Sequence, residues 1–335
     1  MKKNLFGICL VSTALLLAAC GGTGDSAKSS DTKEKTEQAQ KENKENEEKY
    51  VYERNGHKYE VDTVSGATTG EYSGTEYKGD EKQEKMYWSG RPEVGTVKGD
   101  YYTDTIDFED GYIGTADVVV DGDKLVLVEF DERGPDDYYS ETWAGQTKRT
   151  SGYANFQAEN DRTNVTLVTI VNGMTILEDQ MMKENSLTGD FVSVKGSSNS
   201  VRRGFIPLAE KIDGEIKNGS KLSYQAVTKD LGDGLFARLI VIKDKESGKI
   251  TEAKYNEFFA DTEDEIKNKE EKPFYRQSKY DSITYAKETG IDFKKISDDL
   301  TEKIVKDQSL DVSPSDDTIK SHYDSVATDM KDLLK

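Results

Sequence analysis

The chain has 335 residues, which is enough for two domains of ordinary size, and 33% of them are charged. Acidic residues outnumber basic residues by 65 to 46, so the formal net charge at neutral pH is −19. This charge argues against nucleic-acid binding, because the sequence has no basic stripe to replace the counterions of a phosphate backbone. It also argues against electrostatic adhesion to an anionic membrane surface.

The first 20 residues have the pattern of a lipoprotein signal peptide. Lys2 and Lys3 form a charged n-region, and the apolar segment 5–17 is too short to span a bilayer. The sequence Leu-Ala-Ala-Cys at 17–20 matches a lipobox, which makes Cys20 the acylated N-terminus. Cys9 lies in the segment that is removed, so no thiol remains for a disulfide or a thiolate metal site. We therefore expect a lipid anchor on the extracellular face of the cell membrane.

The next segment, 21–49, contains no aromatic residue and no Val, Ile or Leu. Such a segment cannot bury apolar surface, so we expect a disordered tether. The net charge does not favour its binding to the membrane, and its use would be to hold the folded part away from the lipid surface.

Segment 50–98 is expected to be ordered and rich in β-structure. The runs 50–54 and 57–61 alternate in polarity around Asn55-Gly56, which is a strong hairpin signal. The heptapeptide 62–68 follows and matches the pattern D-x-x-S-G-A-T. Its glycine and alanine leave the backbone open to close approach, so the threonine hydroxyl at its end is accessible to a modifying enzyme. The alternative is a polar loop with no special role.

Two stretches beyond residue 98 have the same order of predicted elements, with an offset of about 125 residues. Each begins with a predicted hairpin, at 111–130 and at 234–255, because β-branched runs flank a glycine-containing turn. Later elements also correspond: 153–156 with 285–293, and an amphipathic helix at 168–182 with one at 296–305. We therefore expect tandem α+β domains at 99–215 and 216–335, each an antiparallel sheet with packed helices.

The signal peptide, the heptapeptide and the repeated hairpins together resemble the flavinylated FMN-binding-domain lipoproteins, which include the peptide-pheromone lipoproteins of Gram-positive extracellular electron transfer. The resemblance implies FMN bound covalently, as a phosphoester, to the motif threonine. The residues concerned are Thr68 as the acceptor, with Asp62, Ser65, Gly66 and Ala67 around it. The implied function is that of an electron carrier rather than an enzyme, because the flavin ring itself takes up the electrons.

The same resemblance implies the partners. A flavin transferase would install the FMN, a membrane quinone-linked donor would supply electrons, and extracellular acceptors would receive them. It also implies two FMN-binding-like domains. In that family the motif starts the last helix of the domain, where free N–H groups favour a phosphate.

This chain departs from the family pattern at both expected places. In the first repeat the stretch 194–200 has Ser198 where the motif has threonine, and in the second repeat 311–318 ends on Thr318 but is interrupted by Pro314 and extra acidic residues. Ser198 and Thr318 are therefore secondary candidates. Either FMN on the N-terminal segment docks against a repeat, or the motif has drifted and the chain is a binding or structural surface lipoprotein or a pheromone precursor.

Other signals are weaker. Six aromatic residues could pack against a flavin ring or simply fill the core: Trp88, Tyr101, Tyr102, Tyr138, Tyr139 and Trp143. The acidic clusters lack calcium-loop spacing, and the two histidines, His57 and His322, form no His-x-x-x-His pair, so no metal site is expected. A hydrolase is disfavoured because the sequence lacks the G-x-S-x-G elbow. A solute-binding lipoprotein is disfavoured because the sequence shows no βαβ alternation.

Overall fold

The computed structural model describes residues 49–65, 74–108, 111–139, 142–197 and 201–335. These residues belong to one compact unit. The signal peptide and Cys20 lie outside the described residues, and so do the motif residues Gly66, Ala67 and Thr68 and the secondary candidate Ser198. Within the described part of the chain, no helix combines the length and the apolar character needed to cross a membrane.

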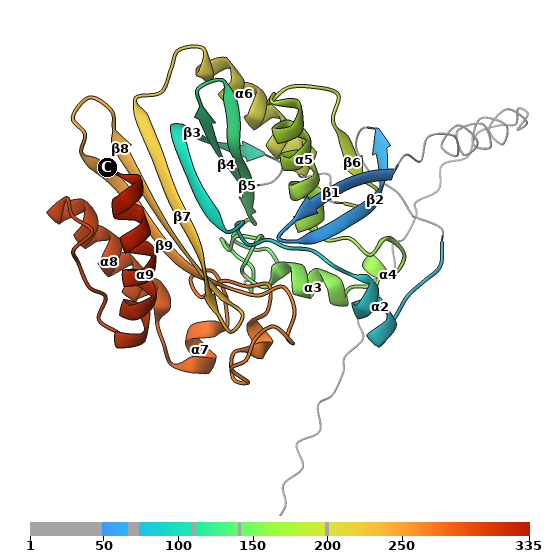
Figure 1. Cartoon of the computed structure of the whole chain (residues 1–335). Coiled ribbons are helices and arrows are strands. Elements are labelled where there is room, and N and C mark those ends of the chain that lie inside the picture. The colour runs from blue at the N-terminus through green and yellow to red at the C-terminus, as the bar shows by residue number, and fades with distance from the viewer. Residues whose placement is uncertain (1–48, 66–73, 109–110, 140–141, 198–200) are drawn as a thin grey trace, which may run out of the picture. The chain divides into compact units, whose positions relative to one another are not determined.

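A six-stranded antiparallel sheet forms the centre, with strand order β5-β4-β3-β7-β8-β9 (Figure 1). Its strands are β3 (Gly95–Phe108), β4 (Tyr112–Asp121), β5 (Lys124–Arg133), β7 (Leu222–Gly232), β8 (Leu235–Asp244) and β9 (Ile250–Phe259). The two hairpins expected from the sequence, β4–β5 and β8–β9, are confirmed. The sheet is continuous because β3 pairs with β7, with Gly99 opposite Tyr224.

Helices follow each half of the sheet, the first half being β3 to β5 and the second half β7 to β9. After β5 come α3 (Tyr153–Glu159), α4 (Thr163–Thr166), α5 (Ile170–Glu184), the π-helix η1 (Val201–Phe205) and α6 (Ile206–Ile216). After β9 come the 3-10 helix η2 (Lys272–Phe274), α7 (Tyr285–Thr289), α8 (Phe293–Asp307) and α9 (Asp317–Leu333). The expected helices at 168–182 and 296–305 are therefore present as α5 and α8. The fold is mixed α+β, with antiparallel sheets and packed helices.

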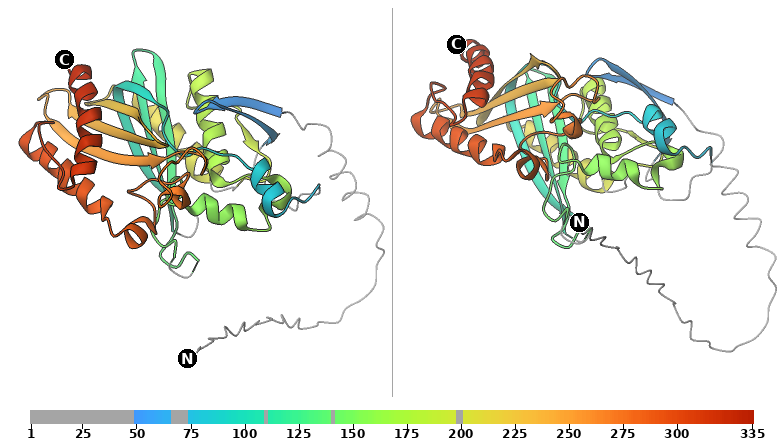
Figure 2. Two further views of the ribbon diagram at one scale, coloured as in Figure 1. Left: turned by 60° about the horizontal axis from the view of Figure 1, so that its bottom comes forward. Right: turned by 90° about the horizontal axis from the view of Figure 1, so that it is seen from below.

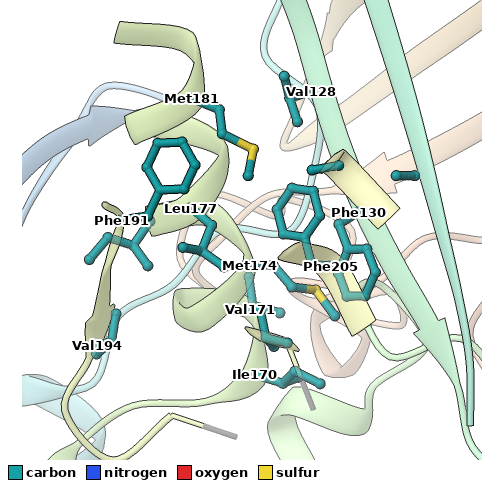
Figure 3. Packing of buried hydrophobic residues seen from close by; sticks show 14 of the residues in the cluster. Val128, Phe130, Ile170, Val171, Met174, Leu177, Met181, Phe191, Val194 and Phe205 are labelled. Atoms are coloured by element: carbon teal, nitrogen blue, oxygen red, sulfur yellow. The ribbon is translucent and has the colours of Figure 1, made fainter. Parts of the chain in front are cut away.

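The helices pack on the strands of their own half. Helix α5 contacts β5 and α6 contacts β3 and β4, while α8 contacts β9 and α9 contacts β7 and β8. Figure 1 shows these two groups of helices at opposite ends of the sheet. In the first half, Phe130 stacks on Phe205 with ring centroids 4.6 Å apart, and Met174 and Leu177 of α5 lie in the same buried cluster (Figure 3).

The strand register places alternate residues on the opposite face of this sheet. Glu129 of β5 stands opposite Asp117 of β4, and Ile240 of β8 stands opposite Ala226 of β7. An apolar cluster fills one part of this second face, and its buried members are Tyr101, Val119, Tyr224, Ala226, Ile240 and Ile242. Charged residues occupy the rest of the face, so the sheet separates a largely apolar side from a partly charged side.

A smaller sheet is formed by β1 (Lys49–Arg54), β2 (His57–Ser65) and β6 (Val192–Val194), in the order β1-β2-β6. The hairpin expected at Asn55-Gly56 is confirmed, since Arg54 pairs with His57. Helix α5 lies between this sheet and the central sheet, as the views in Figures 1 and 2 agree.

The rest of the N-terminal region differs in detail from a β-rich segment. A short helix, α2 (Gly79–Lys85), follows the motif, and β3 already begins at Gly95. The helix is held to the main body because the ammonium of buried Lys82 donates to Asn160 O (3.0 Å) and to Asn164 Oδ1 (2.8 Å). The first residue of β1, Lys49, is the last residue of the segment expected to be a tether.

Candidate functional site

The strand that leads into the intact motif is fixed to the body of the protein. The Asp62 carbonyl accepts a hydrogen bond from Lys195 N at 2.8 Å, and Ser65 pairs with Val192 at the end of β2. Strand β6 is in turn bound to α5, because Gln180 Nε2 donates to Val192 O at 2.9 Å. The structure thus brings the start of the intact motif beside the degenerate stretch of the first half, which the sequence did not predict.

A guanidinium lies next to this strand end. Arg202 donates through Nη1 to Phe191 O at 2.6 Å and to Ser193 Oγ at 3.0 Å, on either side of Val192. Partial burial lowers the pKa of Arg202, and no carboxylate within the described ranges forms an ion pair with it. A positive group without a counter-charge favours an anion such as a phosphoester in its neighbourhood.

The corresponding place in the second half has the opposite charge. Asp316 caps α9, and its Oδ1 accepts from Thr318 N at 2.9 Å and from Ile319 N at 3.0 Å. Thr318 is exposed in the first turn and follows a second acidic residue, Asp317. Because carboxylates already occupy this helix N-terminus, it is a poor place for a further anion.

A cavity of about 650 Å³ lies over the charged face of the central sheet. Both edge strands, β5 and β9, contribute to its walls. At its base Glu129 Oε2 accepts from Arg238 Nη1 at 2.8 Å. Arg149 binds Glu178 through two hydrogen bonds of 2.6 and 2.9 Å. Although burial opposes the effect, Arg238 and Arg149 lower the pKa of Glu129 to about 2.

Asp131 is a carboxyl group of this cavity that holds the loop after β5 in place. Burial raises the pKa of Asp131 to about 7, against the opposing charge of Arg149. Its Oδ1 accepts from three backbone N–H groups, those of Glu132 (2.8 Å), Lys148 (3.0 Å) and Arg149 (3.2 Å). The side chain therefore holds the following loop against the strand.

An asparagine has the same role in the second half. Asn256 Oδ1 accepts from Glu257 N at 2.8 Å and from Tyr280 N at 3.2 Å. Asp131 and Asn256 occupy equivalent strand positions, each one residue before a buried glutamate that pairs with a lysine.

The aromatic candidates mostly pack within the protein itself. Trp88 is buried under the guanidinium of Arg276, 3.8 Å from its ring, and Tyr101 donates to Asp117 Oδ1 at 2.6 Å. Tyr138, Tyr139 and Trp143 lie in one aromatic cluster with Tyr153 and Phe156, and Tyr102 lies in the core. Of the six, only Tyr139 is exposed, at 44%.

The two histidines contact neighbouring side chains of other kinds, aromatic rings in one case and a carboxylate in the other. His57 stacks on Tyr87, and His322 Nδ1 lies 3.0 Å from Glu257 Oε1. Among the residues that the structure describes, no group of three or more His, Cys, Asp or Glu side chains could hold a metal ion.

No protein-family model matches this sequence, and neither a curated protein nor a solved structure matches it. The function is therefore inferred from the residues of the chain.

Proposed function

We propose that this protein is a lipid-anchored extracellular electron carrier with FMN bound covalently to Thr68. Cys20 would carry the lipid, and the flavin would supply the electron chemistry. A flavin transferase would attach the FMN, a membrane quinone-linked donor would reduce the carrier, and extracellular acceptors would oxidise it. The motif Asp62-Thr63-Val64-Ser65-Gly66-Ala67-Thr68 carries the proposal, because it is the one intact copy in the chain.

The surroundings of β2 support this assignment. The strand ends at Ser65, three residues before the acceptor, and β6 and α5 hold that end in place. Thr68 follows this fixed strand end by three residues in the sequence. The guanidinium of Arg202 lies on the neighbouring strand and matches the negative charge of a phosphoester.

The secondary acceptors fit less well. Thr318 lies beside Asp316 and Asp317, whose carboxylates repel a phosphoester. Ser198 lies outside the described residues, and its stretch lacks both the aspartate and the threonine of the motif.

Intact-mass analysis tests the proposal. The full-length protein is produced with a flavin transferase and with an inactive transferase, and its mass and its flavin fluorescence after denaturation are compared. We expect one FMN per chain on wild type and none on Thr68→Val. The control Thr318→Val should be loaded like wild type, because it removes a threonine hydroxyl in an acidic setting.

Two results would contradict the assignment. Flavin retained on Thr68→Val would move the attachment to another hydroxyl. A wild-type protein without flavin would leave a binding or structural surface lipoprotein, or a pheromone precursor, as the function.

A further inference from the structure

The cavity over the central sheet is separate from the end of β2. Glu129 and Asp131 line it, and they alternate along β5 with Val128 and Phe130, which pack in the cluster that contains α5. The small sheet with the attachment motif lies on the other side of α5. A ligand of the cavity would therefore be distinct from a flavin on Thr68, and the inference below does not depend on that flavin.

Internal ion pairs and hydrogen bonds from tyrosine hydroxyls together account for most of the charged residues that line this cavity. Glu129 pairs with Arg238 at 2.8 Å, and Arg149 pairs with Glu178 at 2.6 Å. Lys254 pairs with Glu252 at 3.1 Å. Two further carboxylates accept tyrosine hydroxyls: Asp117 accepts from Tyr101 at 2.6 Å and Asp298 from Tyr280 at 2.9 Å.

Apart from Asp117 and Asp298, which accept tyrosine hydroxyls, four charged residues of the lining have no ion-pair partner within the described ranges. Two are acidic, Asp131 and Asp281, and two are basic, Arg133 and Lys294. Asp281 Oδ2 accepts from Thr150 Oγ1 and Ser278 Oγ, both at 2.7 Å, but these donors are neutral. The cavity thus combines two acidic and two basic side chains that form no ion pair within the described part of the chain.

The two halves of the sheet show that the charge of Asp131 is not required for the fold. Asn256 accepts the N–H of the next residue and an N–H of the following loop, and Asp131 accepts the equivalent groups. An amide oxygen is sufficient for this role. A carboxylate at Asp131 adds a negative charge, which is costly to bury unless a partner compensates it.

We propose that the cavity binds a small zwitterion, a free amino acid or a short peptide. Its ammonium group would lie against Asp131 and Asp281, and its carboxylate against Arg133 and Lys294. Charge-assisted hydrogen bonds at both ends would fix its orientation. The amide side chains of Gln146 and Asn256, also in the lining, offer partners for a peptide bond. The volume is within the range of about 300–1,000 Å³ that is usual for small-molecule sites.

Calorimetric titration of the full-length protein in detergent tests the proposal. The probes are glycine, dialanine and trialanine, each compared with its N-acetylated and C-amidated forms. We expect at least one free probe to bind and both blocked forms to bind at least tenfold more weakly, because each lacks one charge. Asp131→Asn and Lys294→Met should each weaken binding at least tenfold, while the control Glu246→Gln, in an exposed turn, should leave it unchanged.

The melting temperature of each variant separates loss of binding from loss of fold. Asp131→Asn should melt no earlier than wild type, since Asn256 performs the same structural role. The proposal is overturned if none of the free probes binds wild type. It is also overturned if the blocked probes bind wild type as tightly as the free probes do. The same holds if the folded Asp131→Asn variant binds the free probes as tightly as wild type does.

Discussion

The two halves of the central sheet share a buried lysine–glutamate ion pair, but they differ in the residue that follows the lysine. In the first half Lys148 pairs with Glu132 at 2.5 Å, and in the second half Lys279 pairs with Glu257 at 2.9 Å. Each ammonium lies near the ring of a tyrosine that starts the next helix, Tyr153 at 4.9 Å and Tyr285 at 5.7 Å. The likeness between the halves therefore extends to individual buried side chains.

The residue after each lysine differs between the halves. Arg149 follows Lys148 and binds Glu178, which also lies 3.4 Å from Arg54 of β1. Tyr280 follows Lys279 and donates to Asp298 at 2.9 Å. In the first half this position supports an ionic network that reaches the small sheet. In the second half it supplies a single neutral donor. The shared fold fixes where a side chain stands, and its charge is free to vary.

The approach to the last helix shows the same freedom. Arg202 in the first half leaves a positive group beside the strand that leads into the heptapeptide 62–68. Asp316 in the second half satisfies the helix N-terminus with a carboxylate of the chain itself. Only the first arrangement favours an added anion.

The largest difference between the halves in the stability cost of a substitution is expected at Arg149. Arg149→Met leaves Glu178 buried without its main partner, so we expect a loss of about 3–5 kcal/mol in the free energy of unfolding. Tyr280→Phe, its counterpart, removes one hydrogen bond and should cost about 1 kcal/mol. Urea denaturation followed by circular dichroism measures both, and equal losses would contradict the asymmetry.

A smaller difference in stability is expected at two glycines, each directly before the second strand of its half. Both have positive φ, +90° at Gly111 and +82° at Gly234, so alanine is strained at either. A Cβ at Gly234 would lie 2.5 Å from Glu265 O, whereas one at Gly111 would lie 3.4 Å from Pro135 Cβ. We expect Gly111→Ala to cost about 1 kcal/mol and Gly234→Ala about 2–3 kcal/mol.

Thermal unfolding of the two alanine variants gives the comparison. Because the clash at residue 234 is with backbone, a neighbouring side chain cannot relieve it by rotating. If Gly234→Ala were no less stable than Gly111→Ala, the contact between that turn and Glu265 would not be rigid.

The smallest expected effect is a pH dependence of stability that arises from Asp131. Burial raises its pKa to about 7, so folding favours the protonated form and stability should fall as pH rises from about 4 to about 7. The charged groups around Asp131 are Arg149, Asp281 and its β5 neighbours Glu129 and Arg133. Asp131→Asn should remove this trend and be more stable than wild type at pH 8.

The reverse change at the equivalent position sharpens that test. Asn256→Asp should introduce a similar fall in stability toward neutral pH. Glu129 acts in the other direction, since its lowered pKa stabilises the fold above about pH 4 and loses that effect below it. Unfolding curves at several pH values separate the two carboxylates, and a flat profile for wild type between pH 5 and 8 would contradict the prediction for Asp131.

Local patterns were sufficient to predict the hairpins and the long helices. Alternation around Asn55-Gly56, and β-branched runs around the turns at 121–123 and 245–249, gave the correct strand pairs. The amphipathic pattern located α5 and α8 within three residues at each end. The pairing of β3 with β7 was not predicted, because an edge-to-edge contact leaves no periodic signal in either strand.

The candidate sites were harder to predict for a related reason. Strand β6 has only three residues, too few for a pattern, yet it fixes the end of β2. Asp131 and Asp281 are separated by 150 positions, and only the tertiary structure places them on one cavity. A signal that was present in the sequence is the recurrence of Gln-Thr-Lys at 146–148 as Gln-Ser-Lys at 277–279, which marks equivalent loops.

The ladder between β3 and β7 has a consequence for how this molecule can be divided. Gly95 to Asp100 pairs with Ser223 to Thr228 in the middle of the sheet, so separating the halves would uncover two long unsatisfied edges. Such edges promote aggregation between molecules. Although the two halves resemble each other, neither half should exist alone in solution, and loss of one should take the other with it in a single transition.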